Sequence, residues 1–245
     1  MSATDPSDFP GPHDASVPHQ SSLAPATGWA VLHLFCAAGP HVEMSGVLNA
    51  VKEIEGAGDQ VVTVAVLGHK ADVAFMVLGP DVWRLRDFQT QVQRAGLVVV
   101  GSFVSLTEVS EYASNLPEDM KQTRLYPRLP PQGKTAFCFY PMSKRRAADH
   151  NWYALGFDDR LELMHGHGRV GREFRGRVVQ LITGATGLDD WEWGVTLFAG
   201  HPDYLKQCVY EMRFDDASAH YAEFGPFWTG VVADPDEVLS RVLSR

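Results

Sequence analysis

The chain has 245 residues, of which 45% are hydrophobic and 21% charged, a balance that excludes disorder of the whole chain and is typical of a protein with a substantial core. Its formal net charge of -9 argues against a general affinity for nucleic acid or anionic membranes, because Lys and Arg neutralise the phosphates in such complexes. The cysteines Cys36, Cys138 and Cys208 are odd in number and lack a CxxC spacing, which indicates neither a disulfide framework nor a zinc site.

The N-terminal segment, residues 1–26, is rich in Pro, Ser, Asp and Ala and has almost no large apolar side chains, so we expect a flexible tail. It contains no basic stretch followed by an apolar run. No segment approaches the roughly 20 apolar residues that span a bilayer. We therefore expect a cytoplasmic protein without a membrane span.

Residues 27–115 are predicted to form one unit. Apolar runs predict strands, and 3.6-residue periodicity predicts helices. The strands are expected over 28–36, 60–68, 72–79 and 97–105, and the helices over 41–56 and 81–95. The order strand, helix, strand, strand, helix, strand is that of a ferredoxin-like unit.

A second unit with the same order is predicted over residues 135–245, after a linker at 116–134 in which RLYPRLPPQG (124–133) disfavours regular structure. Its expected elements are strands at 135–141, 177–185 and 191–198, helices at about 157–176 and 202–213, and a poorly defined last element through 218–230. Two such units can join their antiparallel sheets into one larger sheet or barrel with helices outside. We therefore predict an α+β protein, a duplicated ferredoxin-like fold (dimeric α+β barrel), with room for a ligand between a sheet face and a helix face.

The second-unit helix contains an unusual stretch, LMHGHGRVGREF (163–174). At 100° per residue, His167 shares the apolar stripe of Leu163 and Val170, whereas His165 points elsewhere. The glycines would let a large flat molecule approach, although each costs about 0.5–1 kcal/mol relative to Ala in a helix interior. His167 is thus either a core histidine with a satisfied hydrogen bond or an axial ligand of haem iron. No second group of ligands accompanies it to indicate zinc or non-haem iron.

Five segments of the second unit form a specific combination: YPMSKRR (140–146), NWY (151–153), HGRVGR (167–172), QLITGATGLDDWEWGVTLF (180–198) and YEMRFDDASAHYAEFG (210–225). With them the sequence resembles the coproheme decarboxylases of bacterial haem synthesis, which are relatives of the chlorite dismutases and the dye-decolourising peroxidases. The resemblance covers essentially the whole second half, and GWAVLHLF near the start gives weaker support in the first.

This resemblance implies that the protein converts iron-coproporphyrin III and hydrogen peroxide into haem b by two successive oxidative decarboxylations. His167 corresponds to the proximal iron ligand, Tyr140 to the tyrosine that becomes the oxidising radical, and Lys144 to the lysine that assists the second decarboxylation. The positions that correspond to other porphyrin contacts are Trp152 and Met142 beside the macrocycle, Gln180 on the distal side, and Arg213, Ser218 and, less directly, Arg172 at the propionates. The family also implies a homo-oligomer, commonly a pentamer, and makes a ferrochelatase a candidate partner.

Each of these residues also has an ordinary structural interpretation. The charged run Lys144–Arg146 could be a solvated turn, and Tyr140 and Trp152 could be core aromatics. Gln180 could lie on an exposed strand face. Arg213 could form a surface ion pair with Asp215 or Asp216, which is worth about 0–1 kcal/mol. The charged types nevertheless suit a ligand with several carboxylates, which Arg and Lys bind even in an acidic protein.

Two other functions remain open at this point. One is a chlorite dismutase or peroxidase-like haem enzyme, although chlorite dismutation is associated in the family with a distal arginine at the position of Gln180. The other is a non-catalytic haem-binding protein. The spacing of Tyr140 and Lys144 favours the decarboxylase, whereas the residues of the first half that would contact propionates are not assigned.

Overall fold

The structure, a computed structural model, describes residues 23–113 and 115–244. Residues 1–22 of the expected tail lie outside these described residues. The first half contains β1 (Ala30–Ala38), α1 (Met44–Gly56), β2 (Gln60–Leu67), β3 (Val73–Gly79), α2 (Val82–Arg94) and β4 (Leu97–Thr107), as the sequence predicts. A short 3-10 turn, η2 (Glu111–Ala113), follows β4.

The expected linker contains a helix that the sequence analysis did not predict, α3 (Glu118–Leu125). After it come β5 (Ala136–Lys144), the 3-10 turn η3 (Trp152–Ala154), α4 (Phe157–Glu173), β6 (Val178–Gly184), β7 (Trp193–Ala199) and α5 (Pro202–Met212). The poorly defined last element, expected through 218–230, resolves into α6 (Asp216–Ala219), β8 (Ala222–Phe224) and β9 (Trp228–Val232). A final helix that was not predicted, α7 (Pro235–Leu243), follows it.

The strands form one antiparallel sheet in the order β7-β6-β4-β1-β3-β2-β9-β5-β8. A further pairing of β5 with β7 closes the order into a ring. The order is β4-β1-β3-β2 in the first half and β9-β5-β7-β6 in the second, so the two halves repeat one topology. The seams between them are β2–β9 and the short β4–β6 pairing at Leu106 and Thr107.

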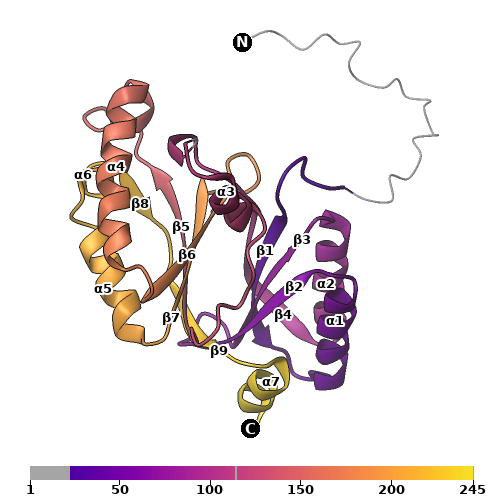
Figure 1. Ribbon diagram of the computed structural model, residues 1–245. Helices are drawn as coiled ribbons and strands as arrows, with labels where there is room; N and C mark the ends of the chain where they lie inside the picture. The colour runs from indigo at the N-terminus through magenta and orange to yellow at the C-terminus, as the bar shows by residue number, and fades with distance from the viewer. Residues whose placement is uncertain (1–22, 114, 245) are drawn as a thin grey trace, which may run out of the picture.

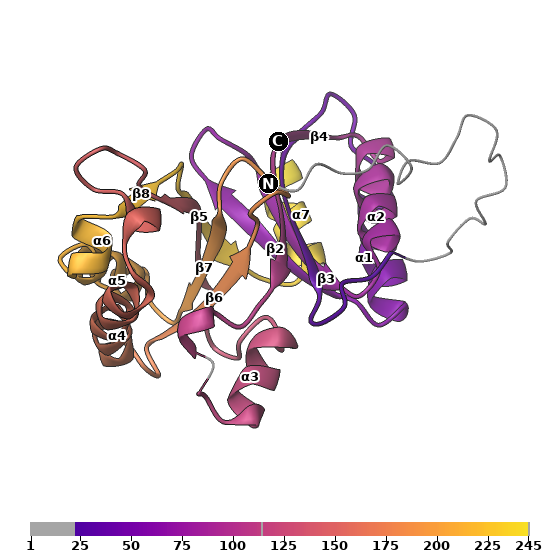
Figure 2. The same cartoon turned by 90° about the horizontal axis from the view of Figure 1, so that it is seen from above.

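The helices lie outside the sheet, α1 and α2 on one side of the molecule and α4, α5 and α6 on the opposite side (Figures 1 and 2). The predicted α+β class, with antiparallel strands and outer helices, is confirmed. No helix in the part of the chain that the structure describes is long and apolar enough to cross a bilayer.

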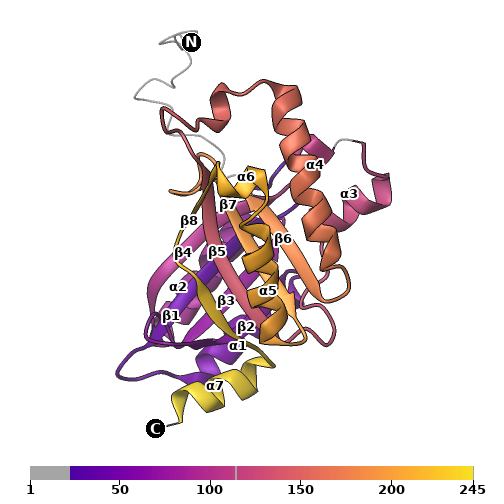
Figure 3. The ribbon, with the colours of Figure 1, turned by 90° about the vertical axis from the view of Figure 1, so that its left-hand side faces the viewer.

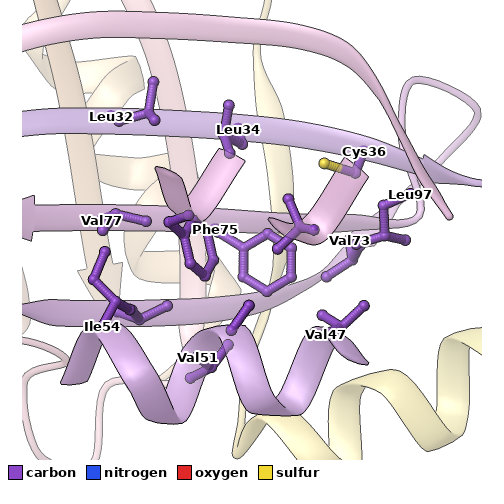
Figure 4. Close-up of a cluster of buried hydrophobic side chains, with 14 of the residues drawn as sticks. Leu32, Leu34, Cys36, Val47, Val51, Ile54, Val73, Phe75, Val77 and Leu97 are labelled. Carbon is purple, nitrogen blue, oxygen red and sulfur yellow. The ribbon is translucent and has the colours of Figure 1, made fainter. Parts of the chain in front are cut away.

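The hydrophobic core is divided by the sheet. In the first half, Val51 of α1 packs near Phe75 of β3 on the outer face of the sheet (Figure 4). Phe88 of α2 is buried in the same cluster. A second cluster, which includes Phe35 and Phe139, fills the space enclosed by the strands. A third cluster lies between α5 and the outer face of β5 and β7, and this cluster supports the candidate site.

Candidate functional site

The two halves differ in how the first helix of each repeat meets the sheet. Helix α1 buries Val47, Ala50, Val51 and Ile54. Helix α4 holds the same place in the order of the second half, yet none of its residues is buried. It packs mainly against the helices α5 and α6 (Figure 3). An amphipathic helix ordinarily buries its apolar stripe, so the unburied apolar stripe of α4 is a candidate binding surface.

The helix glycines agree with an open surface on α4. At Gly166 a methyl group would meet no other heavy atom within 4 Å, and at Gly168 it would meet only Nη1 of Arg172, at 3.5 Å. These glycines are therefore not required by packing within the chain. Ile182 on β6 is an exposed apolar side chain, with 41% of its surface accessible, which again suits a flat apolar ligand.

Strand β5 presents three of the predicted site residues on one face. Tyr140, Met142 and Lys144 alternate with the residues that point into the enclosed core, among them Phe137 and Phe139. Because successive side chains of a strand point to opposite faces, the three share the outer face toward α5. Their spacing of two residues therefore places the three side chains in one row along the strand.

Gln180 on β6 lies on the same outer face. Ile182 pairs with Val195 of β7, and Val195 pairs in turn with Tyr140, so the three side chains form a row across the sheet. Gln180 is two residues before Ile182 and is exposed. Its Nε2 donates a hydrogen bond to Sγ of Cys208 on α5, at 3.4 Å.

Tyr140 is only 7% exposed. Its ring stacks on Phe227, with centroids 4.5 Å apart, and meets the edge of Phe224 at 5.6 Å. Burial raises the pKa of Tyr140 above its ordinary value, and the neighbouring Cys138 and Cys208 act in the same direction. The phenol is therefore neutral at physiological pH and carries a proton that it could lose together with an electron.

Lys144 is buried, so the solvated-turn interpretation is wrong for this residue. Its Nζ lies 4.1 Å from the ring centroid of Trp152 and donates to the carbonyl of Ala217 at 3.1 Å. Burial lowers the pKa of Lys144 to about 8, although the carboxylates of Asp215 and Glu192 oppose this shift. When protonated, an ammonium here can form a charge-assisted hydrogen bond with an incoming carboxylate.

His167 is the histidine of α4 that the fold engages. Its Nδ1 lies 3.0 Å from Oδ2 of Asp215 and 3.4 Å from Oγ of Ser218, whereas His165 is exposed. Burial raises the pKa of Asp215, but its hydrogen bonds with His167 and Ser218 outweigh this effect and leave the pKa below the ordinary value. A carboxylate on Nδ1 leaves Nε2 to bind a metal, which is the usual arrangement around metal-bound histidines.

Helix α6 ties the two sides of the site together. Asp215 caps this helix, Ser218 lies within it, and both contact His167. The carbonyl that accepts from Lys144 belongs to Ala217 of the same helix. One short element therefore sets the positions of a histidine on α4 and a lysine on β5.

Arg172 and Arg213 are not joined to this cluster. Both are exposed, and within residues 23–113 and 115–244 neither side chain forms an ion pair or a hydrogen bond. The ion pair considered between Arg213 and Asp215 or Asp216 does not form, since Asp215 is engaged by His167 instead. Ser218 lies beside the imidazole of His167.

Two residues that the sequence analysis did not select also contact the cluster. Glu192, whose side chain is 7% exposed, accepts a hydrogen bond from the backbone N–H of Lys144 at 2.8 Å. Tyr112 of the first half lies edge-on to Trp152, with centroids 6.2 Å apart, and its hydroxyl accepts from Nε of Arg160 at 2.9 Å. The acidic residue inside the apolar run WEWGVTLFA was the signal for Glu192, whereas nothing local marks Tyr112.

The described residues contain no group of three or more His, Cys, Asp and Glu side chains that could hold a metal ion. A single axial histidine is compatible with a metal already held by a macrocycle, because the macrocycle supplies the remaining nitrogen ligands. The open surface of α4, the exposed Ile182 and the Asp215-backed His167 fit such a group.

Comparisons with known proteins point the same way. The family model described as chlorite dismutase matches residues 42–233. A coproheme decarboxylase, found in two strains of Thermus thermophilus, is 42% identical over 208 residues, which are 82% of this chain and 82% of the relative. A putative heme-binding protein of Natronomonas pharaonis is 44% identical over 193 residues, which are 72% of this chain. The match spans only 32% of that longer relative.

Solved structures give the same fold. A heme-binding protein from Thermus thermophilus has a TM-score of 0.79 and 38% identity, with 88% of this chain and 95% of that chain covered. A chlorite dismutase from Candidatus Nitrospira defluvii has a TM-score of 0.69 at 19% identity, with 89% and 96% covered, and this likeness concerns the fold alone. The family model and the Thermus relative each span most of the chain. The chain therefore belongs to the chlorite dismutase family.

Proposed function

We propose that the protein is a coproheme decarboxylase, which converts iron-coproporphyrin III into haem b with hydrogen peroxide as the oxidant. The Thermus relatives of that name are the first support. The observation that carries the proposal is the link through α6, which holds the buried Lys144 and the Asp215-backed His167 on neighbouring sides of one site. A decarboxylase needs both, a ligand for iron and a cation for a propionate.

The proposed reaction balances with one peroxide for each propionate. The propionate –CH2–CH2–COO⁻ reacts with H2O2 and one proton to give the vinyl group –CH=CH2, CO2 and two molecules of water. Two electrons leave the side chain as the C–C bond to the carboxylate breaks, and the peroxide receives them. When bound, the iron porphyrin supplies the redox chemistry that lets peroxide act as the oxidant.

The residues of the chain have separate proposed roles. His167 would hold the iron through Nε2, because Asp215 engages Nδ1 and fixes the ring. Tyr140, a neutral phenol in an aromatic setting, passes an electron and a proton from the propionate toward the oxidant through a tyrosyl radical. Lys144, whose ammonium lies over the Trp152 ring, would bind a propionate carboxylate, and Trp152 and Met142 would border the macrocycle.

Gln180, Arg172, Arg213 and Ser218 have proposed supporting roles. Gln180 would border the distal side, where its amide is held by Cys208. The exposed Arg172 and Arg213 have no partner among the described residues that would prevent them from binding propionates. Ser218 hydrogen-bonds with His167, so we propose that it steadies the imidazole as well as a propionate.

Two further proposals rest on the family alone, namely a homo-pentamer and a ferrochelatase that delivers the substrate, whereas the proposed cytoplasmic location rests on the cysteine content and the sequence pattern. Light scattering coupled to size-exclusion chromatography would measure the first.

The function is tested by loading the protein with iron-coproporphyrin III under anaerobic conditions and adding peroxide stepwise, with mass analysis of the porphyrin. We expect two successive losses of a carboxyl group in the wild type and none in His167→Ala. A bound porphyrin that survives unchanged would point to the haem-binding alternative. Oxygen release from added chlorite would point to the chlorite dismutase alternative instead.

A further inference from the structure

Glu192 is a buried carboxylate immediately before β7, and both of its oxygens are engaged. Oε2 accepts the backbone N–H of Lys144 at 2.8 Å, and Oε1 accepts from the guanidinium of Arg146. The backbone N–H of Glu192 donates to the carbonyl of Met142 at 3.1 Å and to Oγ of Ser143 at 3.2 Å. One side chain therefore holds the end of β5 and the loop that leaves it.

The loop held in this way carries the aromatic partner of Lys144. After Lys144, the N–H of Arg145 donates to the carbonyl of Tyr221 at 2.8 Å, and the N–H of Trp152 donates back to the carbonyl of Arg145 at 3.0 Å. The ammonium of Lys144 then lies 4.1 Å from the Trp152 ring. Glu192 therefore holds the Lys144 end of this contact directly, through the backbone N–H of Lys144, and it also holds the side chain of Arg146. It reaches the Trp152 end only through the chain that follows Lys144, because the N–H of Trp152 is bound by the carbonyl of Arg145.

We propose that Glu192 is a positioning residue. It keeps the ammonium of Lys144 at the distance and direction from the Trp152 ring that binding of one propionate of the substrate requires. The inference rests on the function proposed above, but it concerns a residue whose two oxygens are engaged by Lys144 and Arg146 and which would act through Lys144. The distance requirement is strict, since a misplacement of about 1 Å at a reacting group can reduce a rate by roughly a hundredfold.

The chemistry of the carboxylate explains why another residue would not serve. The two donors face different oxygens of Glu192, Lys144 at Oε2 and Arg146 at Oε1. A glutamine in the same position would present an oxygen to one donor and an NH2 group to the other. Its NH2 group would meet a second donor in a buried place, which leaves polar groups unpaired. Glu192→Gln therefore keeps the size of the side chain and removes half of its hold on the loop.

Glu192 also acts on the charge of Lys144. The charged groups around this ammonium are the carboxylates of Asp215 on α6 and Glu192 before β7, with the cations Arg145 and Arg146 in the following loop. Both carboxylates raise the pKa of Lys144 against the effect of burial. Removing the charge of Glu192 lowers that pKa further, so the pH range in which Lys144 binds a carboxylate becomes narrower on the alkaline side.

A matched control exists in the first half. The side chain of Asp59 is 0% exposed and forms an ion pair with Arg84 at 2.6 Å, far in sequence from every site residue. Asp59→Asn removes a buried carboxylate from an arginine, as Glu192→Gln does, but without a lysine of the site beside it. Any effect of lost stability alone should therefore appear in both variants.

The first readout needs no porphyrin. Hydrogen exchange of the protein alone, followed by mass spectrometry, should show faster exchange in peptides covering residues 140–153 for Glu192→Gln and unchanged exchange there for Asp59→Asn. Equal exchange in Glu192→Gln and the wild type would overturn the inference, because the loop would then be held without Glu192.

The second readout is the pH profile of the decarboxylation. In Glu192→Gln we expect the step that depends on Lys144 to slow by roughly tenfold to a hundredfold and its alkaline limb to move to lower pH, with the three-propionate intermediate accumulating. Asp59→Asn should keep the wild-type profile. An unchanged profile in Glu192→Gln contradicts the inference, whereas a wild type without any decarboxylation contradicts the proposed function. In that second case the exchange data and the affinity for iron-coproporphyrin III still decide the role of Glu192.

Discussion

Nδ1 of His167 lies 3.0 Å from Oδ2 of Asp215, and the side chain of Asp215 is only 5% exposed. The carboxylate accepts the Nδ1 proton, which fixes the tautomer and the ring direction and makes Nε2 a stronger ligand. Two elements far apart along the chain, α4 and the start of α6, are needed to form this pair.

Asp215→Asn should weaken iron-porphyrin binding by roughly 10- to 100-fold, the usual effect of losing such a supporting carboxylate. The affinity is measured by titrating the protein with iron-coproporphyrin III and following the Soret band. Asp216→Asn is the matched control, because Asp216 is an exposed neighbour in the same helix. Equal affinities for the two variants would show that Asp215 does not support the iron ligand.

Lys144 should make the stability of the protein depend on pH. Burial lowers its pKa from 10.5 to about 8, against the opposing charges of Asp215 and Glu192. Between these pH values the folded protein binds fewer protons than the unfolded chain, so the free energy of unfolding rises with pH. Burial of the charged ammonium lowers the free energy of unfolding by its full amount below pH 8, and this destabilisation has disappeared above pH 10.5.

Accordingly, Lys144→Met should raise the free energy of unfolding at pH 7 by up to about 3 kcal/mol. This gain should disappear as the pH approaches the pKa of an ordinary lysine side chain. Urea unfolding at a series of pH values measures the effect. Lys206→Met, at an exposed position on α5, serves as the control. A loss of stability at pH 7 in Lys144→Met would mean that the contacts of the ammonium outweigh its desolvation.

Gly166 should tolerate a larger residue in the protein alone. A methyl group there meets no heavy atom within 4 Å, and the position lies inside α4. Gly166→Ala should therefore raise the free energy of unfolding by about 0.5–1 kcal/mol. Gly194→Ala provides the contrast, because its methyl group would lie 2.6 Å from Cε1 of Phe103. Thermal unfolding measures both changes, and destabilisation by Gly166→Ala would contradict an open surface on α4.

Much of the fold could be predicted from hydrophobic periodicity, because the strands and helices of both repeats have strong apolar patterns. Helix α3 could not, since its sequence EDMKQTRL buries only Leu125 and therefore has little apolar stripe. Strand β9 is short, and it is defined by its pairing with β2 and β5, which are distant in sequence. Helix α7 does carry local signals, a proline at its start and the buried pair Val238 and Leu239.

The candidate site divides in a similar way. The row of Tyr140, Met142 and Lys144 follows from the two-residue period of a strand, so the sequence could predict it. Asp215 could not be assigned to His167, nor Glu192 to Lys144, because each pair is 48 residues apart and is joined only by the packing of α6 or the pairing of β5 with β7.

The most direct test of the account is mass analysis of the porphyrin after peroxide addition to Tyr140→Phe loaded with iron-coproporphyrin III. Phe keeps the packing on Phe227 and Phe224 but has no hydroxyl to give up an electron and a proton. We use Tyr204→Phe as the control, a partly buried tyrosine of the same hydrophobic cluster. The account predicts binding without decarboxylation in Tyr140→Phe and two carboxyl losses in Tyr204→Phe and the wild type. Wild-type conversion to haem b by Tyr140→Phe would contradict it.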